Sequence, residues 1–469
     1  MRRWIADQLR TTTLGDTRRK DRVAFMIEQF AAKPGESIPQ VFRDWKAIKA
    51  AYRLLSNPRV SPAAIHAALC DSCVDRLREQ NGMVLAVQDT TSLDFSTHPQ
   101  TSDLGPLGGG DGSAGHGFFL HSVLAIGADG VPLGPLHQEV WARDAADTGK
   151  HHQRHERPIE DKESARWLRA LDAVHRAVPA SVEVLTVGDR EADIYALLAF
   201  ERPDHSHLLI RAAQDRRVDG EAGHLLAAVE AAPEAGRYEL LVRQHPTHAM
   251  RNVTVAVRFC AVTLLPPLIG GRRSDLPPVK LTALEVREVP AAEPAATPGD
   301  RAPLRWLLLT DLPVADLATA RDLVGRYCQR WLIERYHYVL KSGCKIEDHQ
   351  LHTAAALQRL LALYCVVAWR LLWMTYAARE HPQEPCTVAF SDLEWQILYW
   401  RQHGRKELPD KPPQLHEAVR WLAKLGGFIG RKGDGEPGVK VLWRGLMQLQ
   451  ENVIGYRLAN PSPEDVGKA

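Results

Sequence analysis

The stretch "TVGDREADIY", residues 186–195, places three acids within five positions directly after an apolar run. Asp189, Glu191 and Asp193 follow "VEVLTV", which is typical of a buried strand. A second short apolar run, in "GMVLAVQDTTSLDF", predicts a strand that ends at Asp89. Two interpretations are open: aspartates that end strands and begin turns or helices, or carboxylates that hold a metal ion.

A further carboxylate lies on a long predicted helix, residues 317–343, with Asp316 as its N-cap and Gly343 as its end. At about 100° per residue, four groups of one continuous helix share a face about 60° wide. These groups are Tyr327, Arg330, Glu334 and Lys341. Val324 and Trp331 border this face, so it meets the core, whereas a solvated stripe usually lies opposite the apolar side. A glutamate that shares a helical face with an arginine, a tyrosine and a lysine indicates a carboxylate beside a phosphate-binding clamp.

The chemistry follows if the three acids meet. Functional groups of an α/β sheet gather at the carboxyl ends of its strands, so Asp89 and Asp189 meet if their strands are neighbours. Adding Glu334 gives three carboxylates that repel by roughly 4 kcal/mol per pair at about 4 Å, and they must protonate or recruit cations. Oxygen ligands favour Mg²⁺ or Mn²⁺, and two such ions support in-line phosphoryl transfer. Arg330 and Lys341 would then bind the flanking phosphates.

The surrounding pattern predicts an α/β chain with helical ends. The runs "FFLHSVLAIGADG" and "VPLGPLHQEVWAR" indicate two strands joined by a hairpin turn. Four strand-like runs separated by Pro- and Gly-rich breaks indicate a β-rich insertion. The predicted divisions are a helical segment 1–80, a core segment 81–236, the β-rich insertion 237–310, a second core segment with the acidic helix 311–350, and a helical region 351–469.

Composition describes a globular chain of 469 residues, 45% hydrophobic and 25% charged, which suggests two or three domains. The net charge of +2 says little about binding partners, but the distribution of charge along the chain is informative. Residues 1–22 carry seven basic and three acidic side chains (7 − 3 = +4), and residues 401–444 carry ten and five (10 − 5 = +5). Basic ends suit a polyanionic partner, although solvated faces produce such counts too.

Several classes of protein are disfavoured. No run of about 18 apolar residues predicts a membrane span, and the basic N-terminus lacks the apolar core of a secretory signal. Seven scattered cysteines indicate reduced thiols; Cys70 and Cys73 form a lone C-x-x-C without the second pair of a zinc site. His151, His152 and His155 lie among polar residues and indicate an exposed linker rather than a metal site.

The aspartates and the spaced polar groups together resemble the DDE triad and YREK signature of bacterial cut-and-paste transposases. The resemblance is to insertion-sequence transposases of the IS-four group, close to those of composite transposons. It rests on "AVQDTTSLDF", "VGDREADIY" and the spacing Tyr327-x2-Arg330-x3-Glu334-x6-Lys341. It extends over about residues 12–455 through "LGDTRRKDR", "AAYRLLSNPRVS", "HSVLAI", "LHQEVWARD", "PLRWLLLTDLPV" and "LGGFIGRKGDGEPG".

The resemblance implies an RNase H-like mixed-sheet core, with the β-rich insertion filling the gap of 145 residues (334 − 189) between the second and third acids. Segment 1–80 would recognise DNA ends, and the region from about 351 would hold a homodimer. The implied ligands of two Mg²⁺ or Mn²⁺ ions are Asp89, Asp189 and Glu334. The implied phosphate-binding residues are Tyr327, Arg330 and Lys341.

Other DNA contacts are implied by the resemblance alone. Trp306 matches a tryptophan that receives a flipped base, although a β-core aromatic is the alternative. Arg211 matches an arginine that contacts DNA near the site, and an arginine that merely ends a strand is the alternative. Arg18, Arg19 and Arg22 fall in the end-recognition region, where ordinary surface arginines would look the same.

The implied function is a bacterial, cytoplasmic DNA transposase whose partners are transposon-end DNA and target DNA. Water would cut each element end, the freed 3′-hydroxyl would form a hairpin on the opposite strand, and the opened ends would join target DNA. Two rivals stay open: a regulator that binds the ends without cutting, which the intact acids disfavour, and a domesticated Mg²⁺-dependent nuclease.

Overall fold

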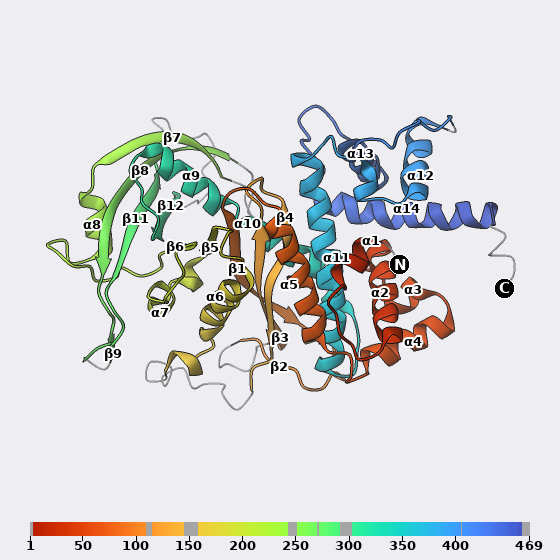
Figure 1. Ribbon diagram of the computed structural model, residues 1–469, viewed down its shortest axis with the longest axis horizontal. Coiled ribbons are helices and arrows are strands. Elements are labelled where there is room, and N and C mark those ends of the chain that lie inside the picture. The colour runs from red at the N-terminus through yellow and green to blue at the C-terminus, as the bar shows by residue number, and fades with distance from the viewer. Residues whose placement is uncertain are drawn as a thin grey trace. The chain divides into compact units, whose positions relative to one another are not determined.

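The computed structural model of the chain (Figure 1) describes residues 3–108, 115–144, 158–242, 251–269, 272–290, 303–404 and 406–461. The chain divides into two compact units. The first unit comprises Met1–Gln80, Thr90–Gly149 and Leu332–Ala469. The second unit comprises Asn81–Asp89 and Lys150–Trp331. The polar linker predicted at His151, His152 and His155 lies outside the described residues.

The N-terminal part of the first unit is helical, as predicted. Its helices are α1 (Arg3–Gln8), α2 (Thr17–Ala32), α3 (Ile38–Phe42), α4 (Trp45–Leu55) and α5 (Pro62–Arg78). They pack on α11, with the ring centroid of Phe30 4.8 Å from that of Tyr364. Arg359 of α11 donates a hydrogen bond to the carbonyl oxygen of Leu55, which satisfies the end of α4, and a second one to that of Val60.

The first unit also contains strands β2 (Gly105–Pro106), β3 (His116–Ile126) and β4 (Pro132–Trp141). The predicted hairpin is confirmed, because β3 and β4 pair in antiparallel fashion with Phe119 opposite Trp141. Strand β1 (Val84–Asp94) is common to both units, its residues from Thr90 onward belonging to the first. These strands run in the order β2-β3-β1, with β4 on β3.

The rest of the first unit is mainly helical. It contains α10 (Trp331–Tyr338), a π-helical turn Val339–Gly343, α11 (Ala354–Glu380), α12 (Asp392–His403), α13 (Leu415–Leu425) and α14 (Val439–Ala459). The first residue of α10, Trp331, belongs to the second unit, and the first unit resumes at Leu332. By length and composition α11 alone among the described helices qualifies as a membrane span. However, 83% of its most apolar window is buried inside the protein, which is the environment of a core helix.

The second unit contains one mixed sheet in the order β1-β5-β6-β12-β11-β8-β7. Its strands after β1 are β5 (Val184–Gly188), β6 (Ser206–Arg211), β7 (Glu234–Val242), β8 (Arg251–Leu264), β11 (Val279–Glu288) and β12 (Arg305–Thr310), with a small hairpin, β9 (Leu268–Ile269) and β10 (Arg272–Arg273). Strands β1, β5 and β6 are parallel, and β12 joins β6 in antiparallel fashion. The β-rich segment therefore continues the core sheet instead of forming its own (Figure 1). The predicted α/β fold class with a mixed sheet and helical termini is confirmed.

One face of this sheet is covered by helices α6 (Ala165–Ala177), α7 (Tyr195–Leu198) and α8 (Leu225–Ala231). Leu208 and Ile210 of β6 and Leu309 of β12 are fully buried against them, and Leu307 of β12 is almost fully buried. Because side chains alternate along a strand, the odd-numbered residues of β6 project from the other face. That second face is where the polar residues discussed below lie.

Two predicted elements differ from the observed ones. The strand expected to end at Asp89 runs to Asp94, because the β-branched Thr90 and Thr91 favour an extended chain that continues along β3. The helix expected over 317–343 is broken: α9 (Leu317–Cys328) ends in a tight turn where Arg330 N donates to Tyr327 O over 3.0 Å, three residues back. The break contains no Gly or Pro, so its residue types do not predict it.

Candidate active site

The parallel register of β1 and β5 brings Asp89 and Asp189 to equivalent positions. Val87 pairs with Val187, and each aspartate follows its valine by two residues. Residues two apart share a face, and neighbouring strands lie about 4.8 Å apart, so the two carboxyl groups project side by side. Burial is the main cause of the raised pKa of Asp189, the backbone N–H of Glu191 opposes it, and the charge of Asp89 raises it further. The two acids therefore interact directly.

Asp189 also begins the turn that follows β5. Its Oδ1 accepts a hydrogen bond of 2.9 Å from the backbone N–H of Glu191 and caps the 3₁₀ turn Arg190–Ala192. Gly188 permits this sharp turn, since a Cβ there would lie 2.5 Å from the Cβ of Ala192. The turn-forming interpretation is therefore correct, and it coexists with the pairing of the two aspartates.

The three acids of 189–193 have three different environments. The Glu191 carboxylate accepts a hydrogen bond of 3.0 Å from Arg166, and its side chain is 63% exposed. Burial raises the pKa of Glu191, Arg166 lowers it, and Asp189 raises it again, so Glu191 lies near Asp189 and Asp89. Asp193 is different: its side chain is fully buried in an ion pair of 2.6 Å with Arg216. Only the first two acids face the aspartate of β1.

Strand β6 adds a cation to the same face. Gly188 pairs with Ile210, so the next position on each strand places Arg211 beside Asp189. Arg211 donates hydrogen bonds to the phenol oxygen of Tyr327 and, over 3.3 Å, to Arg305 O. The positive charge of Arg211 lowers the pKa of Asp189. Arg211 is thus held at the edge of the acid pair and does more than end a strand.

Tyr327 and Trp306 form an aromatic pair on this face. Tyr327, near the end of α9, is 4% exposed, and its ring lies 5.2 Å from that of Trp306 at 65°, an edge-to-face contact. Trp306 is half-buried at the start of β12 and is not a core aromatic of the fully buried kind. The turn after α9 places the Arg330 guanidinium 6.0 Å from the Tyr327 ring, and its charge also lowers the pKa of Asp189.

The remaining two residues of the predicted clamp belong to the first unit. Glu334 is half-buried in the first turn of α10. Lys341, in the π-helical turn, donates a hydrogen bond of 2.8 Å to Ser92 O and lies 3.2 Å from Glu347 Oε1. The prediction that both lie with Tyr327 on one continuous helix is wrong, because α9 ends at Cys328 before α10 begins at Trp331, and the roles of Glu334 and Lys341 stay predictions.

The three N-terminal arginines lie on α2 in the first unit. Arg18 is exposed, Arg19 donates a hydrogen bond of 2.6 Å to Leu14 O, and the Arg22 guanidinium lies 5.6 Å from the ring of Phe25. Arg19 therefore supports its own loop, whereas Arg18 has its side chain at the surface. Contact of the three with DNA stays a prediction.

The chemistry of the donor set fits a hard divalent cation in part. Asp89 and Asp189 offer oxygen ligands, and burial together with the charge of Asp89 raises the pKa of Asp189, while Arg330 and Arg211 lower it. Among the residues that the structure describes, no three His, Cys, Asp or Glu side chains are grouped to hold a metal ion. The binding of a metal ion by the two aspartates stays a prediction. The thiol of Cys73 is a different case: burial raises its pKa to about 12, which disfavours the thiolate that zinc requires.

Sequence reasoning missed the partners that fix these residues in place. Arg166 and Arg216 bind two acids of 189–193 and lie 25 and 23 residues away in the chain. Glu347, the partner of Lys341, was missed in the same way. The acids were conspicuous in the sequence, but nothing in its pattern says which distant arginine reaches which acid.

Three family models match the chain. Residues 147–370 match "Transposase DDE domain", residues 1–60 match "Transposase DNA-binding", and residues 366–465 match "Transposase Tn5 dimerisation domain". A solved structure, the cryo-EM structure of a piggyBac transposase synaptic complex with hairpin DNA, is similar with a TM-score of 0.35 and 12% identity. That match covers 84% of this chain and 77% of the other.

Proposed function

We propose that this chain, a DDE-type transposase, cuts and rejoins DNA at the ends of a mobile element by in-line phosphoryl transfer at Asp89, Asp189 and Glu334. Its matches to DNA-binding and dimerisation models make DNA its partner and a dimer its assembly. Family membership also implies dependence on a divalent metal ion. The IS-four group, the YREK signature, the hairpin route and the identities of both DNA partners belong to the proposal.

The register of three parallel strands carries the proposal. It aligns Asp89, Asp189 and Arg211 on the face of the sheet that α6, α7 and α8 leave free. A carboxylate whose pKa is raised by burial and by the charge of Asp89, next to arginines, forms with Asp89 an arrangement suited to a phosphodiester bridged by cations. When bound, two Mg²⁺ or Mn²⁺ ions would activate the attacking oxygen and stabilise the leaving one.

The protein's own groups supply positioning and charge. Arg211 and Arg330 would bind phosphates flanking the scissile bond, since a guanidinium offers a planar fork to phosphate oxygens. Tyr327 is buried and orients Arg211 through its phenol oxygen, so its contribution to phosphate binding is in part indirect. Trp306 presents an aromatic surface on which a flipped base can stack. Lys341 would exchange its carboxylate partner Glu347 for a phosphate.

The proposed reaction sequence uses the same acids throughout. Water cuts one strand at each element end, the new 3′-hydroxyl attacks the opposite strand to form a hairpin, a second water opens it, and the end joins target DNA. Every step is a displacement at phosphorus with attacking and leaving oxygens in line, so one set of carboxylates serves them all. Two protomers would hold paired ends through the C-terminal helices.

The test is a plasmid that carries the gene's flanking DNA, incubated with purified protein and Mg²⁺. We expect nicks at the flanking inverted repeats, hairpin ends under denaturing electrophoresis, and joined products when target DNA is added. Asp89→Ala and Glu334→Ala should each abolish cutting while end binding, measured by gel shift, survives.

Each rival predicts a distinct outcome. Tight end binding without any cutting identifies a regulator, and cutting without joined products identifies a nuclease. Normal cutting by Glu334→Ala would show that Glu334 is misassigned, and the assignment of Asp89 and Asp189 would not be affected.

A further inference from the structure

We propose that the ion pair between Asp193 and Arg216 positions Arg211 at the distance from Asp189 that the reaction requires. It is called the Asp193–Arg216 pair below. Neither residue is expected to touch DNA or metal, because both side chains are buried, at 0% and 7% exposure. The inference rests on the proposed function, since it assigns the pair a role through two residues of the proposed active site. It also gives Asp193 a different role from Asp189 and Glu191, the other two acids of residues 189–193.

The geometry of the pair is unusually complete. The Asp193 carboxylate accepts two hydrogen bonds from Arg216, from Nε over 2.8 Å and from Nη2 over 2.6 Å, and Arg216 also donates to Asp193 O over 2.6 Å. The second carboxylate oxygen accepts the backbone N–H groups of Ala213 over 2.7 Å and Gln214 over 2.9 Å. One buried side chain thus binds a neighbouring loop through four hydrogen bonds.

These bonds lie where the pairing of β5 with β6 stops. The pairing of β5 with β6 ends at Gly188 and Ile210, so this ladder does not tie Arg211 to Asp189, whereas Arg211 stays paired with Leu308 of β12 on its other side. Immediately beyond, the chain after β5 turns to Asp193 and the chain after β6 turns to Ala213. The Asp193 carboxylate therefore takes over from the ladder and ties the two chain segments together two to four residues past the proposed active-site residues.

Position, more than net stability, is what such a pair determines. Burying two charges costs much of what their attraction returns, and apolar replacements of buried ion pairs are often as stable. A bidentate arginine with two backbone donors, however, fixes distance and direction. Displacement of a phosphate-binding group by about 1 Å is enough to slow a reaction by up to about 10²-fold.

The test is a double-mutant cycle between Arg216→Lys and Arg211→Ala, measured as single-turnover Mg²⁺-dependent nicking of a plasmid that carries the gene's flanking DNA. Lysine keeps the charge but loses the fork. We expect Arg216→Lys to slow nicking by about tenfold or more in the wild-type background and by less than about threefold in Arg211→Ala, because the pair acts through Arg211. Thermal unfolding of all four proteins identifies losses due to misfolding.

The matched control is Asp311→Asn, a carboxylate that accepts a backbone N–H at the opposite end of β6. It should slow nicking by the same factor with and without Arg211→Ala. Equal losses from Arg216→Lys in both backgrounds would overturn the proposal and leave a purely structural pair. Should Arg216→Lys fail to fold, Asp193→Asn enters the same cycle with the same expectation. Nicking by Asp89→Ala would instead overturn the proposed active site and would be recognised separately.

Discussion

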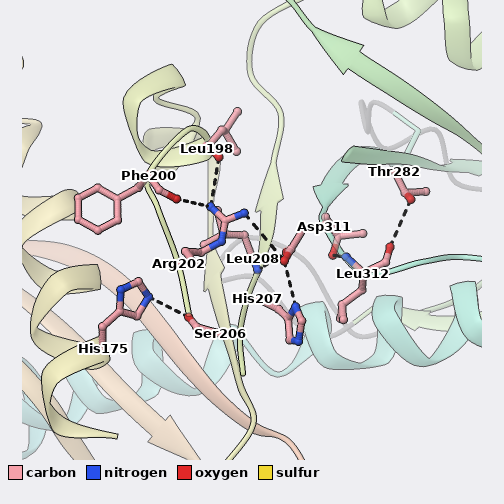
Figure 2. A network of polar contacts seen from close by, with 11 residues as sticks. His175, Leu198, Phe200, Arg202, Ser206, His207, Leu208, Thr282, Asp311 and Leu312 are labelled. Atoms are coloured by element: carbon pink, nitrogen blue, oxygen red, sulfur yellow. Dashed lines mark hydrogen bonds and ion pairs between the residues drawn. The ribbon is translucent and has the colours of Figure 1, made fainter. Parts of the chain in front are cut away.

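Two carboxylates from neighbouring strands, Asp311 after β12 and Asp189 after β5, lie beside opposite ends of strand β6 in different environments. At the start of β6, Asp311 accepts the backbone N–H of Leu208 over 2.7 Å and contacts His207 Nδ1 at 2.9 Å, with Arg202 Nη2 at 3.9 Å (Figure 2). Arg202 is itself held by the carbonyl oxygens of two neighbouring residues. Beside the end of β6, Asp189 accepts one backbone N–H, and burial, with the charge of a second carboxylate, raises its pKa.

The difference separates an acid that serves the fold from one suited to chemistry. Asp311 is surrounded by hydrogen-bond donors that compensate its charge, so it stabilises the start of the strand. Asp189 lies next to Asp89, and folding places the two like charges together at a cost in stability. A half-buried acid whose pKa is raised beside a second carboxylate is a candidate position for binding a cation or a substrate. The comparison makes three predictions.

The largest effect should come from removing each carboxylate in turn. Asp189→Asn should reduce Mg²⁺-dependent nicking by about 10³-fold or more, because a charged metal ligand is lost, without lowering the unfolding temperature of metal-free protein, since the amide oxygen still accepts the Glu191 N–H. Asp311→Ala should lower the free energy of unfolding by about 1–3 kcal/mol, because the Leu208 N–H loses its acceptor, while the folded fraction still nicks. Nicking assays and denaturant unfolding measure both. Equal effects of the two substitutions would remove the distinction.

An intermediate effect should come from the arginine at each end. Arg211→Ala should weaken binding to DNA ends and make the slope of log K against log salt shallower by about one unit, because one phosphate contact is lost. Arg202→Ala should leave that slope unchanged and reduce stability, since its partners are protein carbonyls. Gel-shift titrations at several salt concentrations provide the slopes. An unchanged slope for Arg211→Ala would exclude it from phosphate binding.

The smallest effect is on the pH dependence of stability. The raised pKa of Asp189 means that its contribution to stability, full at low pH, is lost as pH rises through that pKa. Asp189→Asn should therefore be more stable than wild type at pH 7 in the presence of a chelator, and this advantage should shrink toward about pH 4. Thermal unfolding across this range measures it.

His175, near the start of β6, should show the opposite slope (Figure 2). Its ring contacts Ser206 Oγ at 2.8 Å, and burial, followed by the charge of Arg202, lowers its pKa. The folded state then resists a proton that the unfolded chain accepts, so wild type loses stability as pH falls through about 6.5. His175→Gln should be less stable than wild type at pH 7, and this deficit should shrink on acidification. Parallel curves for both variants would contradict the assignments.

Much of the fold was predictable because local patterns determine it. The N-terminal helices, the β3–β4 hairpin and the strands of 237–310 follow from hydrophobic period and turn residues. The N-cap Asp316 is confirmed by its hydrogen bond of 2.8 Å from Thr319 N. The end of α9 was not predictable, because the tight turn at Arg330 contains neither Gly nor Pro to mark it.

The site was predictable only in its residue types. Acids after apolar runs identified Asp89 and Asp189, and their equal offset from the paired valines makes them neighbours. No pattern distinguished Glu191, which Arg166 binds at the surface, from Asp193, which Arg216 binds in the interior. These partners lie on other elements, and an ion pair between distant segments leaves no periodic trace in a sequence.

By itself the sequence determined which groups are available for chemistry and which segments form strands and helices, because propensity and hydrophobic period act over a few residues. Tertiary structure decided which of those groups are neighbours. It aligned β1, β5 and β6 so that two aspartates and an arginine share one face, and it buried Asp193 away from them. The physical reason is register: hydrogen bonds between strands distant in the chain set the positions of side chains that no local preference can fix.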